Sequence, residues 1–525
     1  MGTFKELWNQ KSYEYSALKI KESINDWNSE QRRKIALVKW VWELIQNACD
    51  KLEDKKDISI NIEYDDERLV FKHNGGHFKN EEILALISAG STKPFDQINK
   101  EDEKTGKFGK GFLVSHVVSP KVKIEGQLEK KPFRIYIDRS GDKEEISKNI
   151  SECIDKLDKN EMLESTSSEW TTYTYEEINR DSYEGINRLK KLIPFIFSFR
   201  PEISSIKIND EEFSIKERKC ESYEEKTLEF IYLNNDDTIL TFKNDKDNTT
   251  ISVLLNDKDK KIRVLENNVP KIFKKEPLIG TSGFTFPIII NGNFETDSDR
   301  LNLSRPTDDK QKIVGALELI YPLWNYLKDK YTNCYYLFKF SKVEEDTNRA
   351  FWNIVVKELV EDWINKPIIK IDDDPKKPKE IFLPRIQIPS ETQNFKNTEE
   401  VYLKKINEIL KIMYHAEPIL NDDILLVWYN IIKNWKELGI KEICEEKDIS
   451  SITEYIHRYD DLKSLNETFS KSEEETLNVL IKIFELLNKY KNDFNTTPTN
   501  FKLGIYLNQN GDFCGPEDIC IDNNV

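Results

Sequence analysis

The sequence lacks long apolar runs, and this shortage argues against a membrane-spanning protein. Its longest apolar stretches, such as Phe286–Ile290, hold only a few residues, whereas about 20 are needed to cross a bilayer. The N-terminus has no apolar signal core, and Glu6 stands where a myristoylation signal requires Ser or Thr. We therefore expect a cytoplasmic protein with no membrane partner.

Paired cysteines and an excess of positive charge are also absent. The seven cysteines are scattered and never form a C-x-x-C pair, which favours free buried thiols over a disulfide framework or a zinc site. The 79 Lys and Arg residues are outnumbered by 95 Asp and Glu residues, which gives a net charge of −16. Nucleic acid is therefore not indicated as a partner, although one local basic groove would be compatible with this charge.

Apolar material for packed cores is plentiful. Of the 525 residues, 38% are hydrophobic and 11% are aromatic, which argues against wholesale disorder. The length suggests roughly three domains of about 150 residues each.

Helix and strand patterns alternate in the first 200 residues. Apolar residues recur every three or four positions from Gln31 to Leu52, which predicts a long amphipathic helix. Period-two alternation predicts a β-hairpin over Ile58–Lys72. Further helices are expected at Glu81–Ala89 and Tyr183–Phe195, and strands at Val122–Glu125, Phe133–Asp138, Thr171–Tyr175 and Ile206–Ile208. Helices interleaved with an antiparallel sheet make this first domain, residues 1–202, an α+β domain.

A strand-rich block and then a helical region follow. A small α/β domain over residues 203–306 is predicted by strand patterns at Leu228–Asn234, Thr238–Phe242, Thr249–Leu255 and Phe284–Asn291. Residues 307–525 are mainly helical, with helices expected at Asp309–Tyr331, Glu345–Asn365, Val401–Tyr414, Asp422–Leu438 and Glu473–Tyr490. The tryptophans of this region fall at helical spacing, so we expect them in its core.

One polar stripe on the first long helix is the strongest candidate for chemistry. Glu43, Asn47 and Asp50 occupy positions i, i+4 and i+7, so at about 100° per residue they lie on one narrow face. Apolar positions flank this face, so the three side chains should border the core. The alternative interpretation is an ordinary solvated helix face.

Three later segments favour a ligand site. The turn His73–Phe78 follows a strand, and its glycines allow a ligand to approach the backbone closely. Ser91–Lys93 follows a predicted helix end, and Gly106–Phe112 places three glycines directly before an apolar helix over Phe112–Val118. Backbone amides of such a loop form an anion-binding cradle together with a helix N-terminus. The charged stretch Ser91–Lys110 is expected to be a mobile loop.

Together these segments resemble the GHKL superfamily of ATPases, which includes gyrase, Hsp90, histidine kinases and MutL. The strings ELIQNACD, HNGGHF, GKFGKGF and WTTYTY look like its four motifs in order and lie within roughly the first 200 residues. The resemblance implies a Bergerat-type α/β sandwich that binds ATP and Mg²⁺, followed by an S5-like transducer or middle domain.

The resemblance also implies roles for individual residues. Glu43 would be the general base that polarises the attacking water, Asn47 would hold Mg²⁺, and Asp50 would support the site. The phosphate-binding loop would comprise Gly106, Gly109 and Gly111, with charge from Lys107 or Lys110, and Thr171 would lie near the adenine. The remaining cofactor-binding candidates from the same segments are His73, Asn74, Gly75, Gly76, Ser91, Thr92, Lys93, Phe108 and Phe112.

The second motif departs from the family pattern. In the family it begins with an Asp that accepts a hydrogen bond from the adenine amino group, and here His73 takes that place. A neutral imidazole accepts one hydrogen bond through its unprotonated nitrogen, so adenine recognition would continue in altered form. His77 replaces the last glycine of the motif. The alternative is that both histidines are satisfied by neighbouring backbone.

The segment Asn291–Pro306 resembles two family landmarks. By similarity to the Hsp90 middle domain, Arg305 would reach the γ-phosphate, and by similarity to the sacsin repeat module, Arg300 is an equal candidate. An arginine from a second domain would couple nucleotide state to domain closure. The alternative for each is an ordinary surface ion pair.

These observations predict a sacsin/Hsp90-like, chaperone-type ATPase of prokaryotic origin. Only 42 residues precede Glu43, which leaves no room for the phosphoacceptor helices of a histidine kinase; the gyrase and MutL branches stay open. ATP would close the loop and dock the second domain, and a protein client, a partner subunit or a nucleotide-dependent homodimer is expected. The alternative function is a nucleotide-sensing module of antiphage (antiviral) defence with slow or no hydrolysis. The strand-like end of the sequence suggests a chain truncated at its C-terminus.

Overall fold

The chain folds into two compact units. The computed structural model describes residues 4–50, 57–88, 111–159, 169–244, 246, 248–266, 268–297, 299–343, 349–371, 379–383, 386–389, 400–413, 419–490 and 504–515. The first unit comprises Met1–Phe284 and Ile288–Leu319, and the second comprises Thr285–Pro287 and Ile320–Val525.

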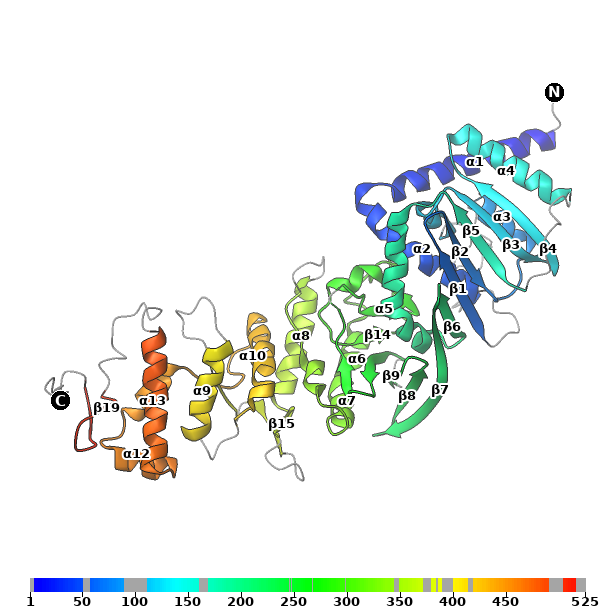
Figure 1. Cartoon of the computed structure of the whole chain (residues 1–525). Coiled ribbons are helices and arrows are strands. Elements are labelled where there is room, and N and C mark those ends of the chain that lie inside the picture. The colour runs from blue at the N-terminus through cyan, green and yellow to red at the C-terminus, as the bar shows by residue number, and fades with distance from the viewer. Residues whose placement is uncertain are drawn as a thin grey trace. The chain divides into compact units, whose positions relative to one another are not determined.

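One sheet of 14 described strands runs through the first unit (Figure 1). Its N-terminal part has the order β6-β1-β2-β5-β3-β4. These strands are β1 (Ile58–Tyr64), β2 (Arg68–His73), β3 (Lys121–Leu128), β4 (Lys131–Asp138), β5 (Thr171–Glu176) and β6 (Ile203–Ile208). The predicted hairpin is the antiparallel β1–β2 pair. However, β1 pairs with β6 in parallel, so the sheet is mixed and the expectation of an antiparallel sheet was wrong. A parallel neighbour needs a crossover, which the preceding helix α5 (Tyr183–Phe199) supplies.

The same sheet continues into the strand-rich block. The boundary expected after residue 202 falls just before β6, which pairs with β1 on one side and with the long strand β7 (Glu211–Tyr223) on the other. The later strands are β8 (Lys226–Leu233), β9 (Asp237–Lys243), β10 (Thr250–Asn256), β11 (Lys261–Arg263), β12 (Ile272–Lys274), β13 (Glu276–Pro277) and β14 (Ile289–Asn291). The strand expected over Phe284–Asn291 is confined to β14, because a 3-10 turn (Ile279–Gly283) and an irregular segment precede it.

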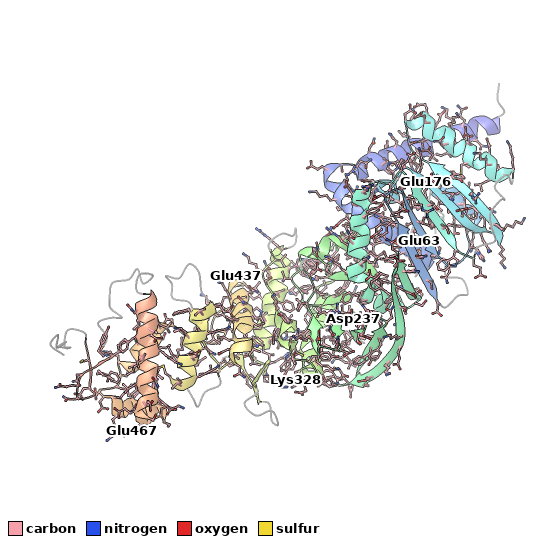
Figure 2. The ribbon with its side chains drawn as sticks, viewed as in Figure 1. Glu63, Glu176, Asp237, Lys328, Glu437 and Glu467 are labelled. Carbon is pink, nitrogen blue, oxygen red and sulfur yellow. The ribbon has the colours of Figure 1, made fainter. Side chains whose placement is uncertain are left out.

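Helices cover the buried face of the N-terminal strands (Figure 1). Along β1, Ile58, Ile60 and Ile62 are buried and alternate with half-buried polar residues, as period-two patterning requires. The covering elements are α1 (Phe4–Trp27), α2 (Glu30–Asp50), α3 (Asn80–Ser88), the 3-10 helix η2 (Phe112–Val117), α4 (Lys143–Asp158) and α5. On the opposite face Glu63, labelled in Figure 2, forms a salt bridge of 3.0 Å with Lys72 of β2.

Two helices of this unit were not predicted. The helix α1 buries only a few apolar residues, among them Ala17, Ile20 and Ile24, so its hydrophobic periodicity is weak. The helix α4 begins at a capping box in which Asp142 and Glu145 satisfy each other's backbone amides. The sequence patterns that mark these two helices are short, and the many charged residues around them obscure the hydrophobic periodicity.

The second unit is mainly helical, as expected. It contains α7 (Ile320–Leu327), α8 (Arg349–Ile364), α9 (Glu400–Met413), α10 (Asp422–Glu437), α11 (Ile449–Ile456), α12 (Leu462–Phe469) and α13 (Glu473–Tyr490). The single helix expected over Asp309–Tyr331 is broken at Leu319, and its first half, α6 (Lys310–Glu318), belongs to the first unit. All five tryptophans assigned to the core are buried, which confirms that prediction. None of the described helices has the length and apolar character needed to span a bilayer.

We expect His116, in η2, to make stability depend on pH. Burial lowers the pKa of His116 to about 4, and the positive charges of Arg139 and Lys21 act in the same direction. As the pH falls, the unfolded chain, with an ordinary histidine pKa of about 6.5, takes up this proton first. Protonation of His116 therefore does not lower the free energy of unfolding above pH 6.5, and lowers it progressively as the pH falls towards 4.

Urea unfolding of wild type and His116→Gln at pH 7 and pH 5 measures this contribution. Wild type should lose about 2 kcal/mol more of its free energy of unfolding than the variant over this interval. An equal pH dependence in the two proteins would contradict the assignment.

Candidate functional site

The predicted polar stripe lies on α2, at the edge of the core. Asn47 is buried, and Glu43 and Asp50 are half-buried. The apolar side of α2 belongs to the main core of the first unit. The helix α2 packs against η2 and β1 through its apolar face. Half-buried polar residues therefore lie at the border between this apolar face and the polar face.

Gly111, the last glycine of the third segment, lies against Glu43. A Cβ atom built on Gly111 would stand 2.0 Å from Glu43 Oε2. Gly111 has ordinary right-handed helical dihedrals, so glycine is needed here for the close approach and not for its backbone freedom. The carboxylate and the start of η2 therefore meet.

The turn after β2 packs on the backbone of α2. A Cβ atom on Gly75 would stand 2.7 Å from the carbonyl oxygen of Ala48. Asn74 fixes the start of the turn, because its Oδ1 accepts a hydrogen bond of 2.8 Å from the Ser59 amide. Gly76 is buried beside it. The turn His73–Phe78 is thus brought to the C-terminal half of α2.

His73 is fully buried and its protonation pattern follows from its neighbours. Its Nδ1 accepts a hydrogen bond of 3.1 Å from the amide of Gly75, and its ring stacks on Tyr173 with 6.1 Å between centroids. When Nδ1 accepts, the neutral ring carries its proton on Nε2. The ring nitrogen expected to accept from adenine is therefore occupied, and the other nitrogen is a donor.

Thr171, the candidate from the motif string WTTYTY, is buried at the start of β5. It lies opposite His73 in the antiparallel pairing of β2 and β5. Phe112 contacts Tyr173 of the same strand, with 5.8 Å between the ring centroids. Residues far apart in the sequence therefore meet around α2.

Asn47 carries an unsatisfied donor. Its Nδ2 is buried and has no hydrogen-bond partner among the described residues, although such a group costs about 1–3 kcal/mol when left unpaired. The described part of the chain has no group of three or more His, Cys, Asp or Glu side chains that could hold a metal. A Mg²⁺ ion held by one side-chain oxygen and by substrate phosphates needs no such group. In Asn47 the atom able to hold such an ion is Oδ1, whereas Nδ2 is a donor suited to an anion or a water molecule.

The two candidate arginines have different surroundings. Arg300 donates from Nη1 to Gln46 Oε1 of α2 at 3.1 Å. Burial lowers the pKa of Arg300, and the carboxylates of Glu43 and Asp50 oppose this effect. The Arg305 side chain is 76% exposed, and its recorded ion pair is with Asp308 at 3.9 Å.

Eight candidates lie outside the described residues. These are Ser91, Thr92, Lys93, Gly106, Lys107, Phe108, Gly109 and Lys110. The expected loop over Ser91–Lys110 lies there as well.

The sequence analysis missed two residues beside the polar stripe. Lys39 forms a salt bridge of 3.1 Å with Glu43, and both side chains are little exposed, at 12% and 14%. Gln46 is buried and receives Arg300. The signal for Lys39 was present, because it stands four residues before Glu43 and so on the same helix face.

Comparison with known proteins adds one partial similarity. No protein-family model matches the chain. Among curated proteins, the chaperone protein HtpG of Borrelia garinii subsp. bavariensis is 32% identical over an alignment of 104 residues. The match covers 16% of this chain and 17% of HtpG, so the chain spans about a sixth of the length of this relative.

The contact between Gly111 and Glu43 predicts an unusual response to alanine. In Gly111→Ala the new methyl group meets the end of a side chain and not backbone. The carboxylate should therefore move and weaken its ion pair with Lys39, at a cost of about 1 kcal/mol. Gly185→Ala is the matched control, because its Cβ would stand 2.8 Å from the backbone oxygen of Leu37 in α2. That variant should lose about 1–3 kcal/mol.

Thermal unfolding compares the two variants, and a crystal structure of Gly111→Ala locates the Glu43 carboxylate. Equal destabilisation, or an unmoved carboxylate, would contradict the close approach.

Proposed function

We propose that the first unit binds and hydrolyses ATP as a sacsin/Hsp90-like member of the GHKL superfamily. The observation that carries the proposal is the contact between the Glu43 carboxylate and Gly111, one helical turn from the buried amide of Asn47. A carboxylate and a neighbouring amide supply two of the groups that hydrolysis of a phosphoanhydride needs: a proton acceptor and a metal ligand.

Glu43 would accept the proton of a water molecule that attacks the γ-phosphorus. The bond from this phosphorus to the bridging oxygen breaks, and ADP and phosphate leave. Asn47 would hold Mg²⁺, which neutralises phosphate charge when bound. Arg300, from the turn after β14, would contribute positive charge near Glu43 and Asn47, because it contacts Gln46 of the same helix.

The similarity to HtpG, a chaperone by name, supports the Hsp90-like assignment. We assign residues 1–202 to nucleotide binding, residues 203–306 to an S5-like transducer and residues 307–525 to client or partner binding. Because Nδ1 of His73 already accepts a hydrogen bond from the Gly75 amide, base recognition would rest on other groups as well. Conformational closure would link nucleotide binding to the helical region.

The first test is calorimetry and turnover with Glu43→Gln. Wild type should bind ATP more tightly with Mg²⁺ than without it and should hydrolyse it. The variant should bind ATP with similar affinity and lose turnover by about 100-fold or more. Glu30→Gln, at the exposed first turn of the same helix, is the control and should be unchanged. Binding without turnover in wild type would favour the nucleotide-sensing alternative, and no binding would refute both functions.

A second test separates the two arginines. Arg300→Met should lower turnover by about tenfold or more, since a cation beside the developing charge is lost. Arg305→Met should stay within about twofold of wild type, because its side chain is exposed. The reverse ranking would assign the phosphate contact to Arg305.

A further inference from the structure

A turn that carries Asp297, Asp299, Arg300 and Leu301 follows β14 in the sequence and contacts α2. Asp297 holds this turn together: its Oδ1 accepts a hydrogen bond of 2.7 Å from the Leu301 amide. The turn is tied to the neighbouring 3-10 turn, because the Gly280 amide donates to the Leu301 carbonyl at 2.9 Å. Arg300 within it has a positive φ of 55°, a conformation that costs a non-glycine residue of order 1–3 kcal/mol unless its surroundings hold it.

Three side chains of α2 contact this turn. The Asp299 carboxylate is paired with Arg32, the Asp299 carbonyl accepts a hydrogen bond of 2.7 Å from Lys39 Nζ, and Arg300 donates to Gln46. Arg32, Lys39 and Gln46 are spaced seven residues apart, which places them on one face of the helix. The turn therefore runs along α2 beside the polar stripe.

Lys39 is the residue that the turn and the polar stripe share. Its ammonium lies 2.7 Å from the Asp299 carbonyl and 3.1 Å from Glu43 Oε1. The Trp27 ring, whose centroid is 5.5 Å from Nζ, also covers it. Exposed ion pairs contribute little, but this one is largely shielded from water, so it can restrict where the Glu43 carboxylate points.

We infer that Lys39 is a positioning residue that holds Glu43 for its reaction, and that the docked turn, through the Asp299 carbonyl, holds Lys39. This inference rests on the proposed function. Lys39 has a donor for each acceptor, because an ammonium carries three N–H groups. When the turn leaves α2, Lys39 loses one of its two anchors and Glu43 loses its fixed orientation. A change in the position of this turn would thereby change the orientation of the general base, Glu43.

Steady-state ATP hydrolysis by the full chain tests the first half of this inference. Lys39→Met should lower kcat by about tenfold or more and change KM by less than about twofold, because orientation and not substrate binding is lost. Lys39→Arg, which can reach both acceptors, should recover most of the loss. Lys34→Met, at an exposed position of the same helix, should match wild type.

The second half is tested by coupling. Arg32→Met removes the ion pairs with Asp299 and Asp26 and the contact with the Trp27 ring. It keeps the Lys39 and Glu43 side chains, so kcat should fall less than in Lys39→Met. The double variant should be no slower than Lys39→Met alone, since both changes act through one contact. Losses that multiply in the double variant would overturn the coupling between turn and base.

Each remaining outcome is decisive. Unchanged kcat in Lys39→Met, or an equal rise in KM, overturns the inference while the proposed function stands. Wild-type protein that does not hydrolyse ATP overturns both. Circular dichroism shows whether Lys39→Met folds, and if it does not, Lys39→Arg and Arg32→Met decide. A wild-type kcat in Arg32→Met overturns the coupling between the turn and Glu43. A partial loss of kcat in Arg32→Met supports this coupling.

Discussion

The architecture of the candidate site depends on how closely η2 approaches α2. The Glu43 carboxylate occupies the space that a side chain on Gly111 would fill, and this is possible because apolar residues of both elements share one core. Burial of that apolar surface draws the two helices together, and the polar stripe at their border is carried along. A carboxylate held in this way is half-shielded from water, so its partners matter more than they would on an open surface.

The polar groups around Glu43 are organised by backbone contacts. Gly75 brings the turn after β2 to the backbone of α2, and its amide sets the tautomer of His73. The Nδ2 atom of Asn47, which has no hydrogen-bond partner in the part of the chain that the structure describes, lies one helical turn from Glu43. A buried polar group without a partner is costly in a resting protein, which is why we associate it with a ligand. Two features thus define the site: the close approach of Gly75 and Gly111 to α2, and the buried Nδ2 of Asn47.

The continuous sheet links this site to the rest of the first unit. Strand β7 pairs with β6 at one end and with β8 at the other, so the turn that carries Arg300 is attached to the same framework as α2. The strained backbone of Arg300 is held in place by contacts at both ends of the turn. Strain of this kind is released when contacts change, which suits an element that reports a change of state.

Hydrophobic periodicity and turn chemistry determined much of this protein from sequence alone. The helix α2, the hairpin β1–β2 and the helices α8, α9, α10 and α13 of the second unit follow from local patterns, whereas α11 and α12 were not predicted. The spacing of Glu43, Asn47 and Asp50 on one helix face needs no tertiary information. Only the tertiary structure decided the parallel pairing of β1 with β6, the tautomer of His73, the different surroundings of Arg300 and Arg305, and the contact of Lys39 with Asp299. The β1–β6 pairing, the contact of Arg300 with Gln46 and the contact of Lys39 with Asp299 join residues distant in sequence. Such contacts leave no periodic trace, because they arise when separate elements pack against one another.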